Sequence, residues 1–239
     1  MIILVFELTI VVDARLGFLC YGVGWFAFLI YAIADEQTER QRFSIILLLI
    51  PSIRIINLSV PFDEIPIIVT LAFDGLLTLL IVFLFSRKLA LNLPQLGLKP
   101  TVGDLRSQTL VALSGFPLGW LGYYIFAPQP LMTLDHPLQW LLITFMVVIG
   151  IGMPTELIFR GVMLRVATEY LGPYGVVFIA VIYAILHIGY GSLFVVLYVL
   201  VLGLYFSWIV IKTKCIVGVS FASGLLYLLT FILAPNVVA

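Results

Sequence analysis

Long apolar runs alternate along this chain with short breaks rich in charged residues, proline and glycine. A helix needs about 20 apolar residues to cross a bilayer, and eight runs reach or approach that length. They cover residues 16–34, 43–60, 66–86, 108–126, 138–168, 174–188, 192–211 and 215–233. The pattern predicts an all-α fold, a polytopic transmembrane helical bundle of about eight spans, in a single membrane domain over residues 1–239.

Three departures from a simple span are also predicted. Residues 1–12 are apolar but short, and Glu7 interrupts them, so we expect a surface or re-entrant helix. Residues 89–107 hold several proline and glycine residues and are expected outside the membrane. The run 138–168 is longer than one span needs, and Pro154 predicts a kink within it.

Composition supports the membrane assignment. The chain is 63% hydrophobic and only 10% charged, with a mean hydropathy of +1.24. A soluble globule of this length cannot bury so many apolar residues. The formal net charge is zero and no basic cluster is interleaved with aromatic residues, so we expect no nucleic-acid partner.

Lysine and arginine residues predict the orientation of the bundle. In the eight-span arrangement only Arg15 falls on one side of the membrane. The other side carries Arg40, Arg42, Arg87, Lys88, Lys99, Arg106, Arg165, Lys212 and Lys214. Because positively charged loops stay in the cytoplasm, we expect this side to be cytoplasmic.

Two charged residues lie within the predicted second and third spans. Arg54 is about 10 Å, and Asp74 about 12 Å, from the loop at Pro61 at 1.5 Å per helical residue. An isolated charge that faces lipid is costly, so we predict a structural ion pair between Arg54 and Asp74. The alternative is a charged pair that faces a substrate.

A second set of ionisable residues lies in the predicted fifth and sixth spans. Glu156 and Arg160 are four residues apart and therefore share one face of a helix. A carboxylate and a guanidinium inside a membrane indicate a functional site, although a pair that only holds two helices together is the alternative. His187 ends the next apolar run. Together these residues predict a polar pocket between helices.

These motifs resemble those of the CPBP family, the intramembrane proteins similar to CAAX prenyl proteases. The resemblance covers Thr155–Gly161, Tyr183–His187, Leu202-Gly203 and the basic hairpin Lys212–Lys214, within a core of approximately residues 138–234. The stretch from Pro51 to Arg54 also resembles some bacterial members. We therefore expect an integral protein of a bacterial or archaeal cell membrane.

The resemblance implies an eight-helix membrane endopeptidase that activates a water with glutamate, histidine and asparagine side chains. Carried over by motif, the second glutamate is Glu156, the arginine is Arg160 and the first histidine is His187. The first glutamate, which is the implied general base, falls on Thr155. The second histidine and the asparagine fall on Ser223 and Tyr227.

Three of these positions therefore lack the implied catalytic group. A threonine hydroxyl cannot accept a proton near neutral pH, and neither Ser223 nor Tyr227 replaces an imidazole. We interpret the chain as a non-catalytic member, a pseudoenzyme that serves as scaffold or accessory subunit of a larger membrane complex. The alternative is an active intramembrane endopeptidase with an altered site, with Glu156 as base, or with Thr155 as nucleophile and His187 as base.

Few ligands are expected. Glu156, His187 and Thr155 are too few for a metal site, and we predict no cofactor. A bound lipid, or a pigment ligated by His187, remains an alternative. The expected partners are membrane lipids and other transmembrane subunits, because glycines permit close helix packing; they are Gly22, Gly24, Gly115, Gly119 and Gly122.

Overall fold

The computed structural model describes residues 2–35, 37–59, 67–99, 105–129 and 137–238, and within these ranges all regular structure is helical. Seven helical stretches are long and apolar enough to cross a membrane. They are Ala14–Ala34, Thr38–Ser59, Val69–Lys88, Leu105–Phe126, Gln139–Leu171, Leu193–Thr213 and Val217–Val238. The shorter helix Tyr174–Tyr190 takes the place of the remaining predicted span. The predicted all-α polytopic bundle is thus confirmed.

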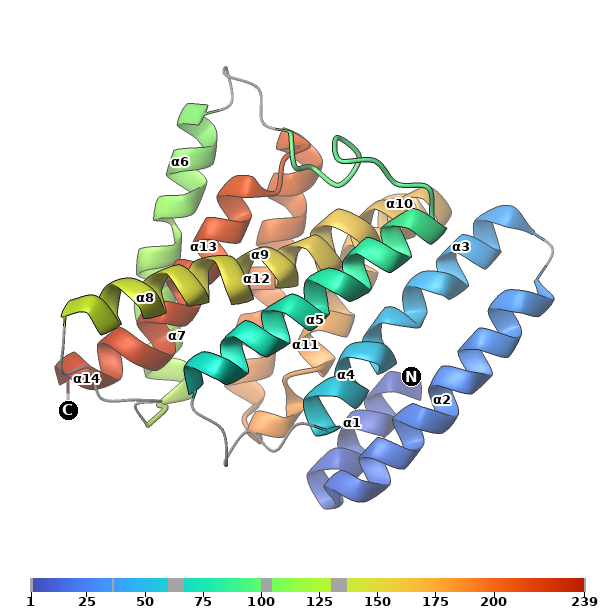
Figure 1. Cartoon of the computed structure of the whole chain (residues 1–239), viewed down its shortest axis with the longest axis horizontal. Helices are drawn as coiled ribbons and strands as arrows, with labels where there is room; N and C mark the ends of the chain where they lie inside the picture. The colour runs from blue at the N-terminus through green and yellow to red at the C-terminus, as the bar shows by residue number, and fades with distance from the viewer. Residues whose placement is uncertain (1, 36, 60–66, 100–104, 130–136, 239) are drawn as a thin grey trace.

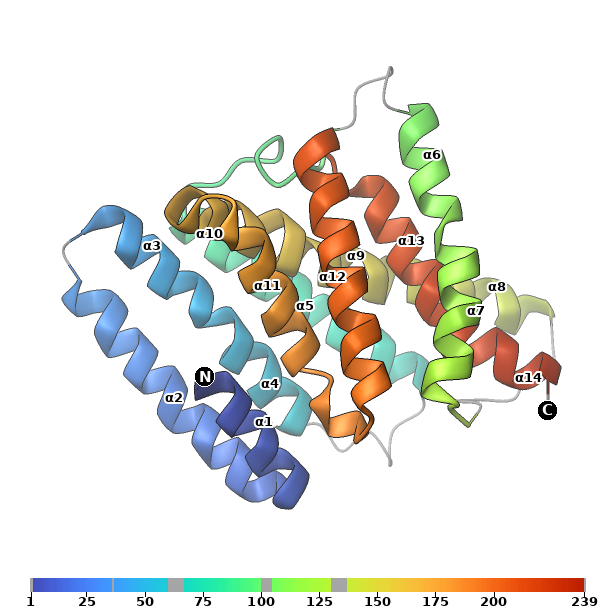
Figure 2. The ribbon, with the colours of Figure 1, turned by 180° about the vertical axis from the view of Figure 1, so that it is seen from behind.

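Helices follow one another along the whole of the described ranges. The first part contains α1 (Ile2–Val12), α2 (Ala14–Ala34), α3 (Thr38–Leu47), α4 (Leu49–Ser59), α5 (Ile67–Lys88), α6 (Leu105–Leu113) and α7 (Gly115–Phe126). The second contains α8 (Pro137–Val147), η3 (Val148–Gly152), α9 (Met153–Glu156), η4 (Leu157–Met163), α10 (Leu164–Leu171), α11 (Tyr174–Ile185), η5 (Ile188–Tyr190), α12 (Leu193–Thr213), α13 (Val217–Leu228), η6 (Leu229–Leu233) and α14 (Ala234–Val238). Figures 1 and 2 show α2 at one edge of the bundle and α6–α7 with α14 at the opposite edge.

The first helix packs into the bundle. Asp13 caps α2 by accepting a 2.7 Å hydrogen bond from the backbone N–H of Arg15. A Cβ atom on Gly17 or Gly24 would overlap side chains of α1, so the two helices approach closely. Glu7 of α1 is completely buried. One face of α1 therefore packs against the bundle, while Ile2, Val5, Leu8, Val11 and Val12 on its other positions are exposed. The surface or re-entrant position of residues 1–12 in the membrane stays a prediction.

The segment from α8 to α10 is one helical rod with two π-helical stretches, η3 and η4, on either side of α9. Proline has no N–H to donate, so Pro154 removes one backbone hydrogen bond there, and π turns accommodate the disturbance. Figure 1 shows the rod crossing the bundle between α5 and α13. Gly224 of α13 lies against Val148, and Gly152 lies against Gly224, so this crossing is very close.

Four of the five glycines that were expected to allow close packing lie against other helices of this chain. Gly115, Gly119 and Gly122 of α7 face α13 and η6, where an added Cβ would overlap their backbone or side-chain atoms. Gly24 faces Phe6, and an added Cβ on Gly22 meets nothing within 4 Å. Gly24, Gly115, Gly119 and Gly122 therefore serve the internal packing of the bundle and provide no evidence for another subunit.

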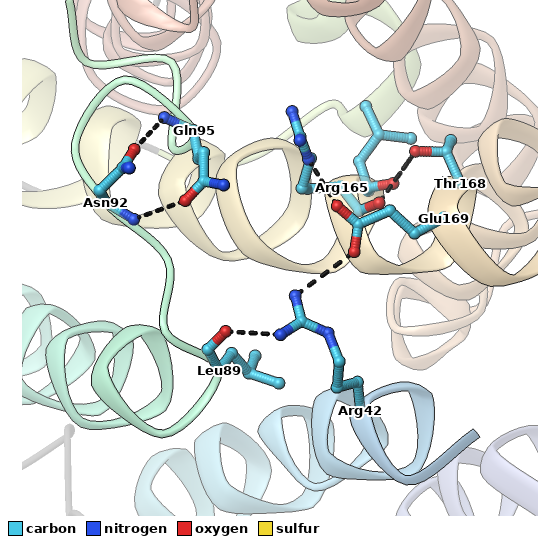
Figure 3. A network of polar contacts seen from close by, with 8 residues as sticks. Arg42, Leu89, Asn92, Gln95, Arg165, Thr168 and Glu169 are labelled. Carbon is cyan, nitrogen blue, oxygen red and sulfur yellow. Dashed lines mark hydrogen bonds and ion pairs between the residues drawn. The ribbon is translucent and has the colours of Figure 1, made fainter. Parts of the chain in front are cut away.

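One end of the bundle, where α5 and α12 finish, gathers basic residues and is called the basic end below. Nη1 of Arg42 donates a 2.7 Å hydrogen bond to the carbonyl of Leu89, and Nη2 lies 3.3 Å from Oε2 of Glu169 (Figure 3). Nε of Arg165 donates to the other oxygen of Glu169 at 2.8 Å. The network joins α3, α10 and the loop after α5.

Candidate functional site

The predicted pair of Glu156 and Arg160 forms inside the bundle. Nη1 of Arg160 lies 3.2 Å from Oε1 of Glu156, and both side chains are fully buried. Every residue of η4, which carries Arg160, is buried, so this turn is surrounded by protein on all sides. The guanidinium lies 4.5 Å from the ring centroid of Tyr183 and within 6 Å of two further rings, Phe159 and Phe206. The charge is thus held by one carboxylate and a cage of aromatic rings.

His187 continues this cluster from the end of α11. Its ring centroid lies 5.1 Å from that of Tyr183, the ring that contacts Arg160. Nδ1 of His187 lies 2.9 Å from the carbonyl oxygen of Tyr183. Because a carbonyl oxygen only accepts, Nδ1 carries the proton in this arrangement and Nε2 keeps its lone pair. The Glu156, Arg160, Tyr183 and His187 side chains therefore form one continuous chain of contacts.

A cavity of about 320 Å³ lies beside this cluster. Thr155 from α9, His187 from the end of α11, and Ser223 and Tyr227 from α13 all line it. These are four of the positions singled out from the sequence motifs, and the structure brings them together from three separate segments. Glu156 lies behind the wall of the cavity, next to Ser223.

The predicted ion pair of Arg54 with Asp74 is wrong, because Arg54 pairs with Glu7. Nε of Arg54 donates a 2.6 Å hydrogen bond to Oε1 of Glu7, and Nη2 donates to Oε2. The hydroxyl of Tyr21 donates to the same carboxylate at 2.6 Å. Depth counted along each helix placed Arg54 and Asp74 at one level, but it could not reveal that α1 inserts a closer carboxylate.

Asp74 is a site residue that the sequence interpretation assigned to a different role. It lines the same cavity as Arg54, Thr155 and His187. Among the described residues nothing hydrogen-bonds its Oδ1 atom. An acidic residue in a membrane span is a sufficient sequence signal for a functional site. The sequence analysis preferred a structural pair with Arg54 and kept a substrate-facing charged pair only as the alternative.

Within the described ranges, no three His, Cys, Asp or Glu side chains lie close enough together to hold a metal ion. The cavity instead combines one imidazole, one carboxylate and several hydroxyls with apolar rings. Such a wall can bind a partly polar molecule and can donate and accept hydrogen bonds.

The fold and this site define a polytopic helical membrane protein with a partly polar cavity inside its bundle. Residues 137–232 match the family model described as type II CAAX prenyl endopeptidase Rce1-like. This part of the chain is therefore a domain of that family. No curated protein and no solved structure matches the chain at a significant level.

The match contains one group of candidate residues and leaves out the other. Thr155, Glu156, Arg160, His187, Ser223 and Tyr227 all lie inside residues 137–232. Asp74, Arg54 and Glu7 lie outside the matched range, on α5, α4 and α1. The N-terminal helices thus add charged groups of their own to the wall and surroundings of the cavity.

Proposed function

We propose that this chain is a non-catalytic member of the Rce1-like family that serves as a binding or scaffold subunit in a membrane assembly. The observation that carries the proposal is the position of Thr155, Ser223 and Tyr227. They line one cavity with His187, as the motif alignment requires, yet they lack the base, the second imidazole and the amide that the resemblance implies.

The chemistry of the remaining groups supports this reading. Glu156 is fully buried against Arg160 and lies behind the cavity wall, so its carboxylate is engaged in holding the helix. Hydroxyl groups of threonine and serine do not accept protons near neutral pH. Removing members of a catalytic set that acts as a unit abolishes nearly all of its rate enhancement.

Gentle extraction from the native membrane tests the scaffold role. The expected result is a complex larger than the lone chain, with a defined second polypeptide in constant stoichiometry. Glu39→Gln at an exposed position in the first turn of α3 serves as a surface control and should leave the complex unchanged. A monodisperse lone chain, recovered in several mild detergents and still folded, would contradict the proposal.

A second candidate is an endopeptidase with an altered site, and Asp74 is the observation that favours it. Its carboxylate lines the cavity that also holds His187 and Thr155. A carboxylate and an imidazole in one cavity can together orient and deprotonate a water that attacks a peptide carbonyl, with the proton passing to the leaving amine. On this hypothesis Asp74 takes the place of the base that is missing at position 155.

Cleavage of membrane-inserted peptides separates the two candidates. If the enzyme hypothesis holds, Asp74→Asn and His187→Ala each lower turnover at least about a hundredfold. Asp13→Asn is the matched control, because it makes the same carboxylate-to-amide change at the cap of α2, where asparagine caps equally well. Turnover that is absent in every form, or equal in all of them, excludes the enzyme.

The sidedness and origin of the protein belong to the same proposal. The basic end carries the arginine network of Figure 3 and the lysines that finish α5 and α12. By the positive-inside rule this end faces the cytoplasm of a bacterial or archaeal cell. Labelling of a cysteine placed at the exposed residue Glu39, in intact cells and in lysed cells, tests this orientation.

A further inference from the structure

A second, smaller hollow lies at the basic end and shares no lining residue with the cavity described above. Its volume is about 70 Å³. Its walls come from the loop after α5, from η4 and α10, and from the end of α12. The lining residues are Pro94, Gln95, Leu96, Gly97, Arg160, Leu164, Arg165, Thr168, Val210, Ile211 and Lys214. We call it the basic crevice.

Arg160 forms the inner wall of the basic crevice. Only its Nη1 reaches Glu156, and among the described residues no acceptor hydrogen-bonds Nε or Nη2. The residue is only 2% exposed. Leaving charged donors buried without acceptors costs considerable free energy, and the flat fork of a guanidinium matches the oxygens of a phosphate group. The unpaired atoms of Arg160 therefore indicate an anionic ligand in the crevice.

The charged residues around the crevice also favour an anion, because basic side chains are in excess there. Arg165 and Lys214 line it together with Arg160. Two carboxylates oppose them: Glu156 holds Arg160, while Glu169 is divided between Arg165 and Arg42 (Figure 3). Three basic residues thus line the crevice, and neither Glu156 nor Glu169 lines it, so the local field attracts an anion.

The walls of the crevice are held in place before any ligand arrives. Asn92 and Gln95 exchange two hydrogen bonds, from each backbone N–H to the other side chain, at 3.0 and 2.9 Å (Figure 3). The N–H of Ile216 donates a 3.0 Å hydrogen bond to the carbonyl of Gly97, which joins the loop to the start of α13. A site that is already ordered loses less free energy on binding.

Residues beside the crevice are of the kind found at the membrane interface. On α12, Nζ of Lys212 lies 5.1 Å from the ring centroid of Trp208, which is 55% exposed. Exposed tryptophan next to lysine is typical of the membrane interface. Lys214, which lines the basic crevice, follows at the end of the same helix. The basic crevice therefore opens at the level of Trp208 and Lys212.

We propose that the basic crevice binds the phosphate group of an anionic amphiphile at the membrane surface. Basic pockets between transmembrane helices at the cytoplasmic side take such headgroups, and the volume admits a single tetrahedral phosphate. The inference rests on the proposed sidedness of the basic end but not on the scaffold role, because Arg160 lines the basic crevice and does not line the cavity. A bound phosphate also completes the coordination of the arginine that holds Glu156.

Binding of three probes to the purified full chain in neutral detergent tests the proposal. It also distinguishes the phosphate group of a lipid from free inorganic phosphate. They are dioctanoyl phosphatidate, dioctanoyl phosphatidylcholine and inorganic phosphate, with binding measured by thermal shift and by native mass spectrometry. A lipid site shows saturable stabilisation by phosphatidate alone. A site for free phosphate also responds to millimolar inorganic phosphate. Equal effects of phosphatidate and phosphatidylcholine would overturn the proposal.

Variants locate the binding in the crevice. Arg165→Gln and Lys214→Asn should each weaken phosphatidate binding about tenfold, since each removes one charge-assisted contact. Asparagine is chosen at position 214 because the backbone there has a φ of 55°, which asparagine tolerates. Lys88→Gln is the matched control, at the exposed end of α5 outside the crevice.

Arg160→Lys gives the sharpest single test, because it keeps a positive charge for Glu156 but removes the unpaired fork. It should weaken binding more than either surface change. Should this variant fail to fold, Arg165→Gln and Lys214→Asn decide the outcome alone. If both of these bind like the unaltered chain, or if Lys88→Gln loses as much affinity as they do, the crevice is not the site.

Discussion

Arg54 joins Glu7 to the carbonyl of Leu186, the residue directly before His187. Its Nε and Nη2 hold the carboxylate of α1, and Nη2 also donates a 2.6 Å hydrogen bond to the Leu186 oxygen at the end of α11. This one guanidinium connects the first helix, the fourth helix and the turn that carries the candidate histidine. The position of His187 at the cavity therefore depends on a residue near the start of the chain.

The first prediction follows from that connection. Glu7→Ala leaves the Arg54 guanidinium without its carboxylate, and breaking a buried pair costs about 3–5 kcal/mol. The side chain of Glu7 is 1% exposed and that of Arg54 is 22% exposed, so we expect the lower part of that range. The free energy of unfolding in mixed micelles measures the loss.

The control for this change is Glu39→Ala, which removes an exposed acidic residue from the first turn of α3. It should lower stability by only about 0.3–1 kcal/mol, through the helix dipole. An equal loss in both variants would mean that the Glu7–Arg54 pair adds nothing to the free energy of unfolding beyond the effect of an exposed charge.

A second prediction concerns the close crossing of α13 over η3. An added Cβ on Gly224 would lie 2.5 Å from the Cα atom of Val148, so the backbones must separate. Overpacking of this kind typically costs about 1–3 kcal/mol. Gly224→Ala should therefore unfold at a lower denaturant concentration than the unaltered chain, as followed by circular dichroism.

Gly22→Ala provides the matched control for the glycine test. Nothing lies within 4 Å of the added Cβ at Gly22, and alanine is about 1 kcal/mol more favourable than glycine inside a helix. This variant should be as stable as the unaltered chain or more stable. Destabilisation of both variants by the same amount would contradict the packing that the structure describes.

The sequence predicted best those features that depend on spacing along a helix. Glu156 and Arg160 pair as their separation of four residues requires, and the motif register brought Ser223 and Tyr227 to the cavity that holds His187. The pairing of Glu156 with Arg160 follows from helical periodicity, whereas the positions of Ser223 and Tyr227 were implied by the resemblance to the CPBP family. The prediction of about eight spans rests on equally simple length and hydropathy, and the described residues hold seven long apolar helices and the shorter Tyr174–Tyr190.

The features that were missed depend on how helices rotate and pack. Arg54 and Asp74 were predicted at one depth in the membrane, and both line the same cavity. Depth along a helix does not predict which face of the helix contacts which neighbour, so the pairing partner was wrong. Glu7 lies in a run too short to predict a buried helix, so its pairing with Arg54 had no sequence signal. The π-helical turns around Pro154 were not predictable either, since a shifted hydrogen-bond register leaves the apolar pattern almost unchanged.

The last prediction is that the site can be repaired. Thr155, Ser223 and Tyr227 line the cavity of about 320 Å³ together with His187, so Thr155→Glu, Ser223→His and Tyr227→Asn place the full set of implied groups around one space. A polar cavity of that size admits water, which the new carboxylate and imidazole can hold and deprotonate. We expect the triple variant to cleave a membrane-inserted peptide at a rate detectable by mass spectrometry.

The repaired site carries a stability cost that the same experiment must measure. Tyr227→Asn removes a ring whose centroid lies 4.7 Å from that of Phe231, and the new polar groups lose free energy wherever water does not reach them. Together these effects should lower the free energy of unfolding by about 2–5 kcal/mol.

The control carries Gln in place of Glu at position 155, with the other two changes kept, because glutamine has nearly the same volume but cannot act as a base. Cleavage by the triple variant and none by this control would show that the scaffold supports hydrolysis once the implied groups are present at these three positions. A folded triple variant that cleaves no peptide in a broad screen would mean that the loss of activity has another cause than these three residues.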